Sequence, residues 1–213
     1  MGICKDRVVI VTGAGGGLGA AHAKVFASEG ACVIVNDINT DAAQKVVDEI
    51  TAAGGKASVN TSDITNYADS ANAVKQAIDT YGDLHVVVNN AGINRDRMFA
   101  SMSEAEWDAI MAVHLKGHFC ISSHAVQYWR DQSKAGKKVD ARIINTTSGA
   151  GLQGSIGQSN YAAAKAGIAA LTLNQAAELG RYGITANAIA PAARTGMTTA
   201  VESMATRMAK PED

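Results

Sequence analysis

Residues 7–19 read R-V-V-I-V-T-G-A-G-G-G-L-G, a short apolar run that passes directly into a glycine-rich turn. The apolar run lacks polar–apolar alternation, which is typical of a strand covered on both faces in a parallel sheet. The residues from about 17 to 29 have the pattern of a helix. Because a helix that starts after glycines presents free N–H groups and the positive end of its dipole, this turn is a candidate pyrophosphate site.

The alternation of strand and helix continues along the whole chain. Further short strands are expected at C-V-I-V-N, K-A-S-V-N, H-V-V-V-N-N, R-I-I-N-T-T and I-T-A-N-A-I. Helices are expected at about 40–53, 66–81, 103–131 and 157–181, with Thr40 and Ser103 as N-caps and Ser103 with Glu106 as a capping box. This order predicts an α/β fold, a doubly wound parallel sheet of Rossmann type in three αβα layers, and a single domain over residues 1–213.

Composition narrows the class of partner. The chain is 47% hydrophobic and 18% charged with a formal charge of -1, so nothing favours nucleic acid or an anionic membrane, and a small molecule is expected instead. The three cysteines form no C-x-x-C pair, which predicts neither disulfides nor a metal centre and favours a cytoplasmic setting. We expect no targeting segment and no membrane span.

A carboxylate at the end of the second expected strand bears on the choice of nucleotide. Asp37 follows the glycine loop by about 20 residues, where a carboxylate accepts the ribose hydroxyls of adenosine and repels a 2′-phosphate. The neighbouring Gly16 and Ile38 supply no basic side chain to neutralise such a phosphate. The sequence therefore favours NAD over NADP, although a turn or capping role would also account for Asp37. The candidate cofactor-binding residues of the glycine loop are Gly13, Gly17, Leu18 and Gly19.

Three side chains suggest proton transfer. Tyr161 and Lys165 are four residues apart in an alanine-rich helical stretch, so they share one helix face. A nearby ammonium favours the phenolate, and we expect Lys165 to lower the pKa of Tyr161. Ser148 follows the fifth expected strand, where doubly wound sheets bind ligands, and can donate a second hydrogen bond to the same substrate oxygen. These are the predicted catalytic residues of a hydride-transfer enzyme; singly, each is more simply a surface or turn residue.

Together these residues resemble the short-chain dehydrogenase/reductase family from the N-terminus to about Met197. The loop at 12–19, the run N-N-A-G at 89–92, Ser148, and Y-A-A-A-K at 161–165 stand in the family's order. The stretches N-N-A-G-I-N-R-D-R-M-F, V-H-L-K-G-H-F and G-Q-S-N-Y-A-A-A-K-A-G look most like the 3-hydroxyacyl-CoA dehydrogenase domain of type 2 multifunctional β-oxidation enzymes and related 17β-hydroxysteroid dehydrogenases.

The resemblance implies further roles. Tyr161 would be the acid/base, Ser148 would orient the substrate oxygen, and Lys165 would also bind the nicotinamide ribose. Acyl thioesters or steroids would be substrates, and a homodimer or homotetramer would form. The family also has a seventh strand and a longer substrate lid, which this sequence would lack because it stops at K-P-E-D. The remaining implied cofactor contacts are Asp63, Ile64, Asn90, Ala91, Gly92, Pro191 and Thr195.

Several alternatives stay open. His114 stands where the family usually has an asparagine that helps to hold a relay water, and either a hydrogen-bonding role or a packing role would fit an imidazole. His114 and His118 have metal-ligand spacing but no acidic partner, so we predict no metal. The favoured substrate is a 3-hydroxyacyl thioester, ahead of a hydroxysteroid and of a 3-oxoacyl-carrier-protein reductase. A dinucleotide-binding module without catalysis is the alternative from another class.

Overall fold

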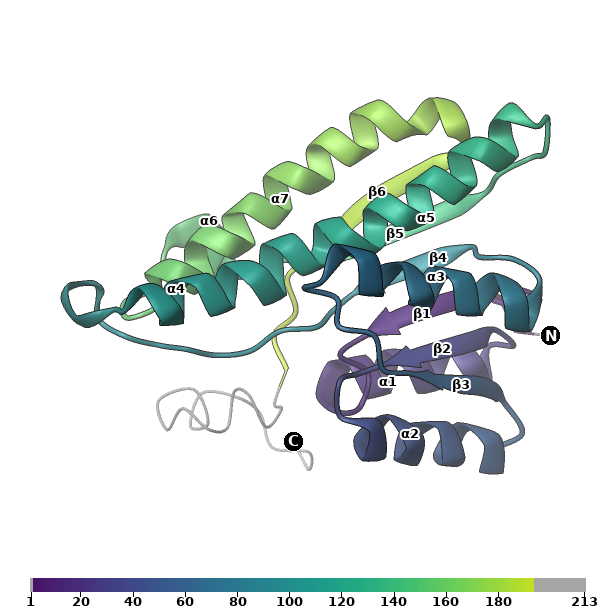
Figure 1. Ribbon diagram of the computed structural model, residues 1–213, viewed down its shortest axis with the longest axis horizontal. Coiled ribbons are helices and arrows are strands. Elements are labelled where there is room, and N and C mark those ends of the chain that lie inside the picture. The colour runs from purple at the N-terminus through teal and green to yellow at the C-terminus, as the bar shows by residue number, and fades with distance from the viewer. Residues whose placement is uncertain (1, 194–213) are drawn as a thin grey trace.

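The computed structural model describes residues 2–193, and within them the chain forms one six-stranded sheet with helices on both faces (Figure 1). The strand order is β3-β2-β1-β4-β5-β6, and every pairing is parallel. The predicted doubly wound α/β fold is therefore confirmed. The strands are β1 (Val8–Thr12), β2 (Cys32–Asn36), β3 (Lys56–Asn60), β4 (Val86–Asn89), β5 (Ala141–Thr146) and β6 (Ile184–Ile189).

Helices connect the strands, as parallel pairing requires. The α-helices are α1 (Gly17–Ser28), α2 (Thr40–Ala52), α3 (Tyr67–Tyr81), α4 (Glu104–Ile110), α5 (Gly117–Lys134), α6 (Gly149–Gln153) and α7 (Ser159–Leu179). Three short helical segments complete the set within residues 2–193: η1 (Phe99–Ser101), a π-helical turn η2 (Met111–Lys116) and η3 (Gly180–Tyr182).

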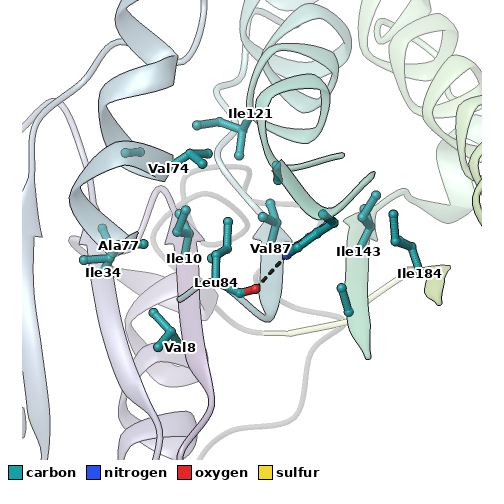
Figure 2. Close-up of a cluster of buried hydrophobic side chains, with 14 of the residues drawn as sticks. Val8, Ile10, Ile34, Val74, Ala77, Leu84, Val87, Ile121, Ile143 and Ile184 are labelled. Carbon is teal, nitrogen blue, oxygen red and sulfur yellow. Dashed lines mark hydrogen bonds between the residues drawn. The ribbon is translucent and has the colours of Figure 1, made fainter. Parts of the chain in front are cut away.

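The core has two halves because neighbouring strand residues point to opposite faces of the sheet. Ile10 and its same-face neighbours pack under α3 and α5, where Val74 and Ile121 meet them (Figure 2). The Trp129 indole of α5 closes this half by donating to the Leu84 backbone oxygen at 2.6 Å. The other half lies under α1 and α2 and consists mostly of valine and alanine. Strands covered on both faces explain the continuous apolar runs in the sequence.

Asparagines hold the carboxyl ends of the strands in register. The Asn36 amide donates to Asn60 Oδ1 at 2.7 Å between β2 and β3, and the Asn89 amide donates to Asn145 Oδ1 at 2.9 Å between β4 and β5. These side chains are buried, so each bond satisfies a group that would be costly to leave unpaired. These two pairs flank the point between β1 and β4 where the strand order reverses, which is where such sheets bind ligands.

The structure corrects three local expectations. The N-cap of α2 is Asn39, whose side chain accepts from Ala42 N, and not Thr40, which is the first helical residue. The single helix expected at 103–131 is divided by the π-helical turn η2, although the capping box of Ser103 and Glu106 is confirmed. The short helix α6 was not predicted, because three of its five residues are glycine or alanine without an apolar period.

Candidate active site

A cleft of about 350 Å³ opens at the carboxyl ends of the strands. It gathers residues from the loop after β1, the ends of β2 and β4, the turn η2, the end of β5, helix α7 and the segment after β6. Most of the predicted site residues thus meet in one place. The lining residues are Gly13, Gly16, Gly17, Leu18, Asp37, Asn90, Gly92, His114, Thr146, Thr147, Ser148, Tyr161, Lys165, Pro191 and Ala193.

The glycine loop is packed so closely that two of its positions admit no side chain. Gly13 has a φ of +61°, and a Cβ there would lie 2.6 Å from the Ala91 Cα atom. A Cβ on Gly19 would lie 2.2 Å from the Gly13 backbone oxygen. Gly19 therefore lets α1 approach the loop rather than lining the cleft. At Gly16, by contrast, no atom lies within 4 Å of such a Cβ, which leaves the loop's outer side open to a ligand.

The loop after β4 is tied to the glycine loop through Thr12. Its hydroxyl accepts hydrogen bonds from Asn90 N at 3.0 Å and from Ala91 N at 3.1 Å. The Asn90 amide in turn donates to the backbone oxygens of Thr12 and Gly13 at 3.0 and 3.2 Å. These bonds fix two walls of the cleft relative to each other.

Asp37 lines the cleft and also shapes it. Its Oδ2 accepts from Gly15 N and its Oδ1 accepts from Asn39 N, both at 2.9 Å. The carboxylate therefore stabilises the turn, which is the simpler of the two interpretations of Asp37. It also places a negative charge at the end of β2 that faces the cleft, as the nucleotide interpretation requires.

Ser148 and Tyr161 meet at the far end of the cleft. Ser148 caps α6, since its Oγ accepts from Ala150 N at 3.2 Å. Burial raises the pKa of the Tyr161 phenol, and a hydrogen bond with the Ser148 side chain acts in the opposite direction. The net pKa of Tyr161 is thus raised rather than lowered as expected, because burial outweighs the hydrogen bond.

Lys165 lies beneath the Tyr161 ring. Its ammonium nitrogen is 5.5 Å from the ring centroid and donates to the Thr146 backbone oxygen at 2.6 Å. The side chain is only 2% exposed, and burial lowers its pKa from 10.5 to about 8. The cation–π distance shows that the two side chains share one helix face, as their spacing predicted.

The burial of Lys165 leads to a prediction about how the free energy of unfolding depends on pH. The pKa of Lys165 is about 8 in the folded state, against an ordinary value of 10.5, so folding disfavours the ammonium. The buried charge therefore destabilises the folded state to the full extent below pH 8. Between these values the unfolded chain holds the extra proton, so stability rises with pH. Relative to Lys165→Met, the wild-type free energy of unfolding should rise by about 3 kcal/mol over this window.

Chemical denaturation at a series of pH values measures this difference. The matched control is Lys45→Met, which removes an exposed ammonium on α2 and should leave the wild-type pH slope unchanged. Parallel curves for wild type and Lys165→Met would contradict the prediction.

His114 packs against the same phenol from the π-helical turn. Its ring meets the Tyr161 ring edge-on, with centroids 5.2 Å apart and planes at 87°. Nε2 lies 2.8 Å from Ile93 O and 3.1 Å from Ile93 N. Burial, and next the charge of Lys165, lower the pKa of His114 to about 4, so the imidazole is neutral near pH 7.

Some predicted contacts lie away from the cleft. Ile64 is 6% exposed and belongs to the core under α3 and α5, while Asp63 turns its carboxylate to Thr65. Ala91 lies behind the glycine loop. The adenine contacts expected of Asp63 and Ile64 remain predictions. Thr195, like Met197, lies outside the described residues.

The structure adds residues that the motifs did not single out. Thr146 and Thr147 directly precede Ser148 in a T-T-S run at the end of β5. Their position at a strand end could have identified them as cleft-lining residues. Ala193 follows Pro191. For His114 the sequence leaves a hydrogen-bonding role and a packing role open, and the residue is marked by its departure from the family's asparagine.

The second histidine of the pair is a core residue. His118 is 1% exposed, and its Nε2 accepts from Thr146 N at 3.3 Å. Among residues 2–193, no group of three or more His, Cys, Asp or Glu side chains could hold a metal ion. No helix in the same range is both long and apolar enough to cross a membrane.

The sheet order and the glycine-lined cleft define the Rossmann class of dinucleotide-binding folds. The chain belongs to the short-chain dehydrogenase family, whose family model matches residues 7–206. The predicted family is therefore confirmed, and members of this family bind nicotinamide dinucleotides.

Individual relatives support the same assignment. The chain is 52% identical over 82% of its length to the hydroxyacyl-CoA dehydrogenase ChsB1 of Mycobacterium tuberculosis. It is 47% identical over 81% of its length to the peroxisomal multifunctional enzyme type 2 of Mus musculus. The crystal structure of a short chain dehydrogenase from Mycobacterium avium superposes with a TM-score of 0.90 at 62% identity, covering 92% of this chain and 71% of that one. The chain spans 57% of the length of the M. tuberculosis relative and 23% of the mouse relative.

Proposed function

We propose that this chain is the dinucleotide-binding and catalytic domain of an NAD-dependent oxidoreductase that interconverts a secondary alcohol and a ketone. The observation that carries the proposal is the convergence of Ser148, Tyr161 and Lys165 in the glycine-lined cleft. A module that only binds a dinucleotide has no evident need for a hydroxyl, a phenol and an ammonium at one end of that cleft.

The cleft has the chemistry that a dinucleotide requires. The open side of Gly16 leaves room beside the amino end of α1 for a pyrophosphate, and Asp37 presents acceptors for ribose hydroxyls. Gly17, Leu18, Asn90, Gly92 and Pro191 would line the rest of the cofactor. The bound nicotinamide would supply or accept the hydride. The Asp37 carboxylate supports NAD rather than NADP, because it would repel a 2′-phosphate.

Side chains of this chain would transfer the proton to and from the substrate oxygen. In ketone reduction, the Tyr161 hydroxyl donates its proton to the substrate oxygen, and in alcohol oxidation the phenolate takes it back. The Ser148 hydroxyl donates a hydrogen bond to the same oxygen and stabilises the charge that develops there. The Lys165 ammonium supplies the positive charge below the Tyr161 ring.

The favoured substrate is a 3-hydroxyacyl thioester. Support comes from the M. tuberculosis relative, which is named a hydroxyacyl-CoA dehydrogenase and shares half of its aligned residues with this chain. A homodimer or homotetramer is proposed as well, on the exposed apolar side chains of Phe119 (49%) and Leu173 (73%) on the long helices α5 and α7. The free cysteines support a reducing, cytoplasmic setting.

The test is NADH oxidation in the presence of a short 3-oxoacyl-CoA, with NADH binding measured separately by fluorescence. A 3-oxosteroid with NADH and a 3-oxoacyl-carrier protein with NADPH form the comparison arms. Turnover of the thioester above both supports the proposal, and preference for another arm replaces the substrate class. Tight NADH binding without turnover in any arm would favour the binding module.

A further inference from the structure

Asn160 directly precedes the proposed acid/base tyrosine in α7, and its side chain is fully buried. It is 0% exposed although it is a polar amide. A side-chain amide has two N–H donors and an acceptor oxygen, and leaving them unpaired in the interior would be costly. Both donors and the oxygen have partners, which come from three different segments of the chain. These bonds make Asn160 a junction beside the site.

The amide oxygen of Asn160 stabilises the start of α7. The first N–H groups of an α-helix have no partner within the helix and are commonly capped by the side chain of the residue before it. Gln158, the N-cap residue of α7, makes no such side-chain bond. Instead, Asn160 Oδ1 accepts from Tyr161 N at 2.8 Å. The backbone of Tyr161 is therefore held by the side chain that precedes it.

The amide nitrogen of Asn160 fastens this helical turn to two other segments. Nδ2 donates to Arg95 O at 3.0 Å, in the loop after β4, and to Glu106 O at 3.2 Å, in α4. In the fold, α4 lies beside the amino end of α7 (Figure 1). The position of the turn that carries Tyr161 is thus set against backbone atoms more than 50 residues away in the sequence.

The loop after β4 is itself fixed to the segment before α7, so it is a firm reference for that position. Arg97 N donates to Gly157 O at 2.7 Å, and the Gln158 amide donates to Asp96 Oδ2 at 2.9 Å. The Arg97 guanidinium also donates twice to Glu106 Oε1, at 2.9 and 3.1 Å. The loop, α4 and the start of α7 therefore form one hydrogen-bonded junction.

We propose that Asn160 is a positioning residue for the Tyr161 hydroxyl. Asn160 is not among the residues that line the cleft, so it acts through the backbone of Tyr161 and not by touching substrate or cofactor. Its hydrogen bonds fix the turn from which the phenol reaches Ser148 and the substrate oxygen. The inference rests on the proposed function, since it concerns the acid/base step of that reaction. Proton transfer needs hydrogen-bond reach, and a displacement of about 1 Å can lower a rate about a hundredfold.

Asn160→Ala removes all three hydrogen bonds and adds neither charge nor volume. We expect kcat for ketone reduction to fall by about 10- to 100-fold, with NADH affinity changed by less than about threefold. The matched control is Trp129→Phe, which also removes a buried donor to a backbone oxygen, but at the amino end of β4, away from the cleft. It should lose stability and keep the kcat of wild type. A kcat in Asn160→Ala within threefold of wild type would overturn the proposal.

A double-mutant cycle with Tyr161→Phe separates positioning from general damage to the cleft. If Asn160 acts through the Tyr161 hydroxyl, Asn160→Ala should lower kcat by less than about threefold once that hydroxyl is absent. An equal loss in both backgrounds would overturn the proposal. Should Asn160→Ala not fold, Asn160→Ser takes its place in the cycle. The serine hydroxyl keeps one hydrogen bond, so kcat should fall by about three- to tenfold, again only when Tyr161 is present.

Fluorine NMR supplies a readout that needs no turnover. The chain has five tyrosines, so labelling with 3-fluorotyrosine gives five resonances, and Tyr161→Phe identifies that of Tyr161. The same Asn160 variant should shift this resonance, because the ring moves relative to His114, which it meets edge-on. Trp129→Phe should leave it in place. An unmoved resonance in the Asn160 variant would overturn the proposal. An inactive wild type would count against the proposed function, and the resonance would still decide the role of Asn160.

Discussion

Tyr161→Phe should lower kcat for ketone reduction by about 10²- to 10⁴-fold, the usual contribution of a positioned general acid. The variant keeps the aromatic ring, so the edge contact with His114 and the position over Lys165 are retained. It removes only the hydroxyl that would protonate the substrate oxygen and that hydrogen-bonds the Ser148 side chain. NADH affinity should change by less than about threefold, because the loss of one hydroxyl at the catalytic end leaves the nucleotide contacts in place.

The measurement is steady-state kinetics beside equilibrium NADH binding, on wild type and variant. Tyr182→Phe is the matched control, since it removes a phenol hydroxyl that accepts from Arg181 outside the cleft lining. Equal turnover in wild type and Tyr161→Phe would remove Tyr161 from the acid/base role. A large loss of NADH affinity would instead assign the phenol to cofactor binding.

The sheet could be predicted from sequence because its signals are local. Each strand is a short apolar run, and each is followed by a helical pattern, so the chain order alone limits the topology. The cleft followed from that order, since residues at the carboxyl ends of parallel strands meet at one edge. Ser148 and Asp37, which both follow strand ends, line the cleft.

The remaining features depend on contacts that no periodicity encodes. The π-helical turn at Met111–Lys116 adds a residue to one helical turn, and the sequence there looks like ordinary helix. The burial of Ile64 is another such feature, because its side chain packs against Gly117, where a Cβ would lie 2.7 Å from Ile64 Cδ1. The absence of a side chain on another helix thus placed it in the core.

The acid/base pair shows the limit of reasoning from spacing. Positions i and i+4 put Tyr161 and Lys165 on one face, and the structure agrees. Spacing says nothing of depth, however, and burial turned out to be the largest cause of both pKa shifts, raising that of Tyr161 and lowering that of Lys165. The partner of the lysine, the Thr146 backbone oxygen, comes from a strand end that a helical pattern cannot reveal.

Asp37→Asn should move the preference between nicotinamide cofactors toward NADPH. The ratio of NADH affinity to NADPH affinity is expected to fall by about tenfold to a hundredfold, because the variant removes the charge that opposes a 2′-phosphate at close range. The amide oxygen can still accept from Gly15 N or Asn39 N, so the turn that shapes the loop is kept in part. Adding Ile38→Arg should lower the ratio further, since Ile38 is 76% exposed beside Asp37 and a guanidinium there could pair with the phosphate.

Dissociation constants for NADH and NADPH, measured by fluorescence at one ionic strength, check this expectation. Asp41→Asn is the matched control, because it removes the same charge from an exposed position in the first turn of α2. The control should leave the ratio near that of wild type. An unchanged ratio in Asp37→Asn would mean that Asp37 serves only the turn, and the proposed choice of NAD would lose its support. A fall in both affinities by the same factor would mean that the variant damages the glycine loop, since uniform weakening leaves the discrimination between the two cofactors untouched.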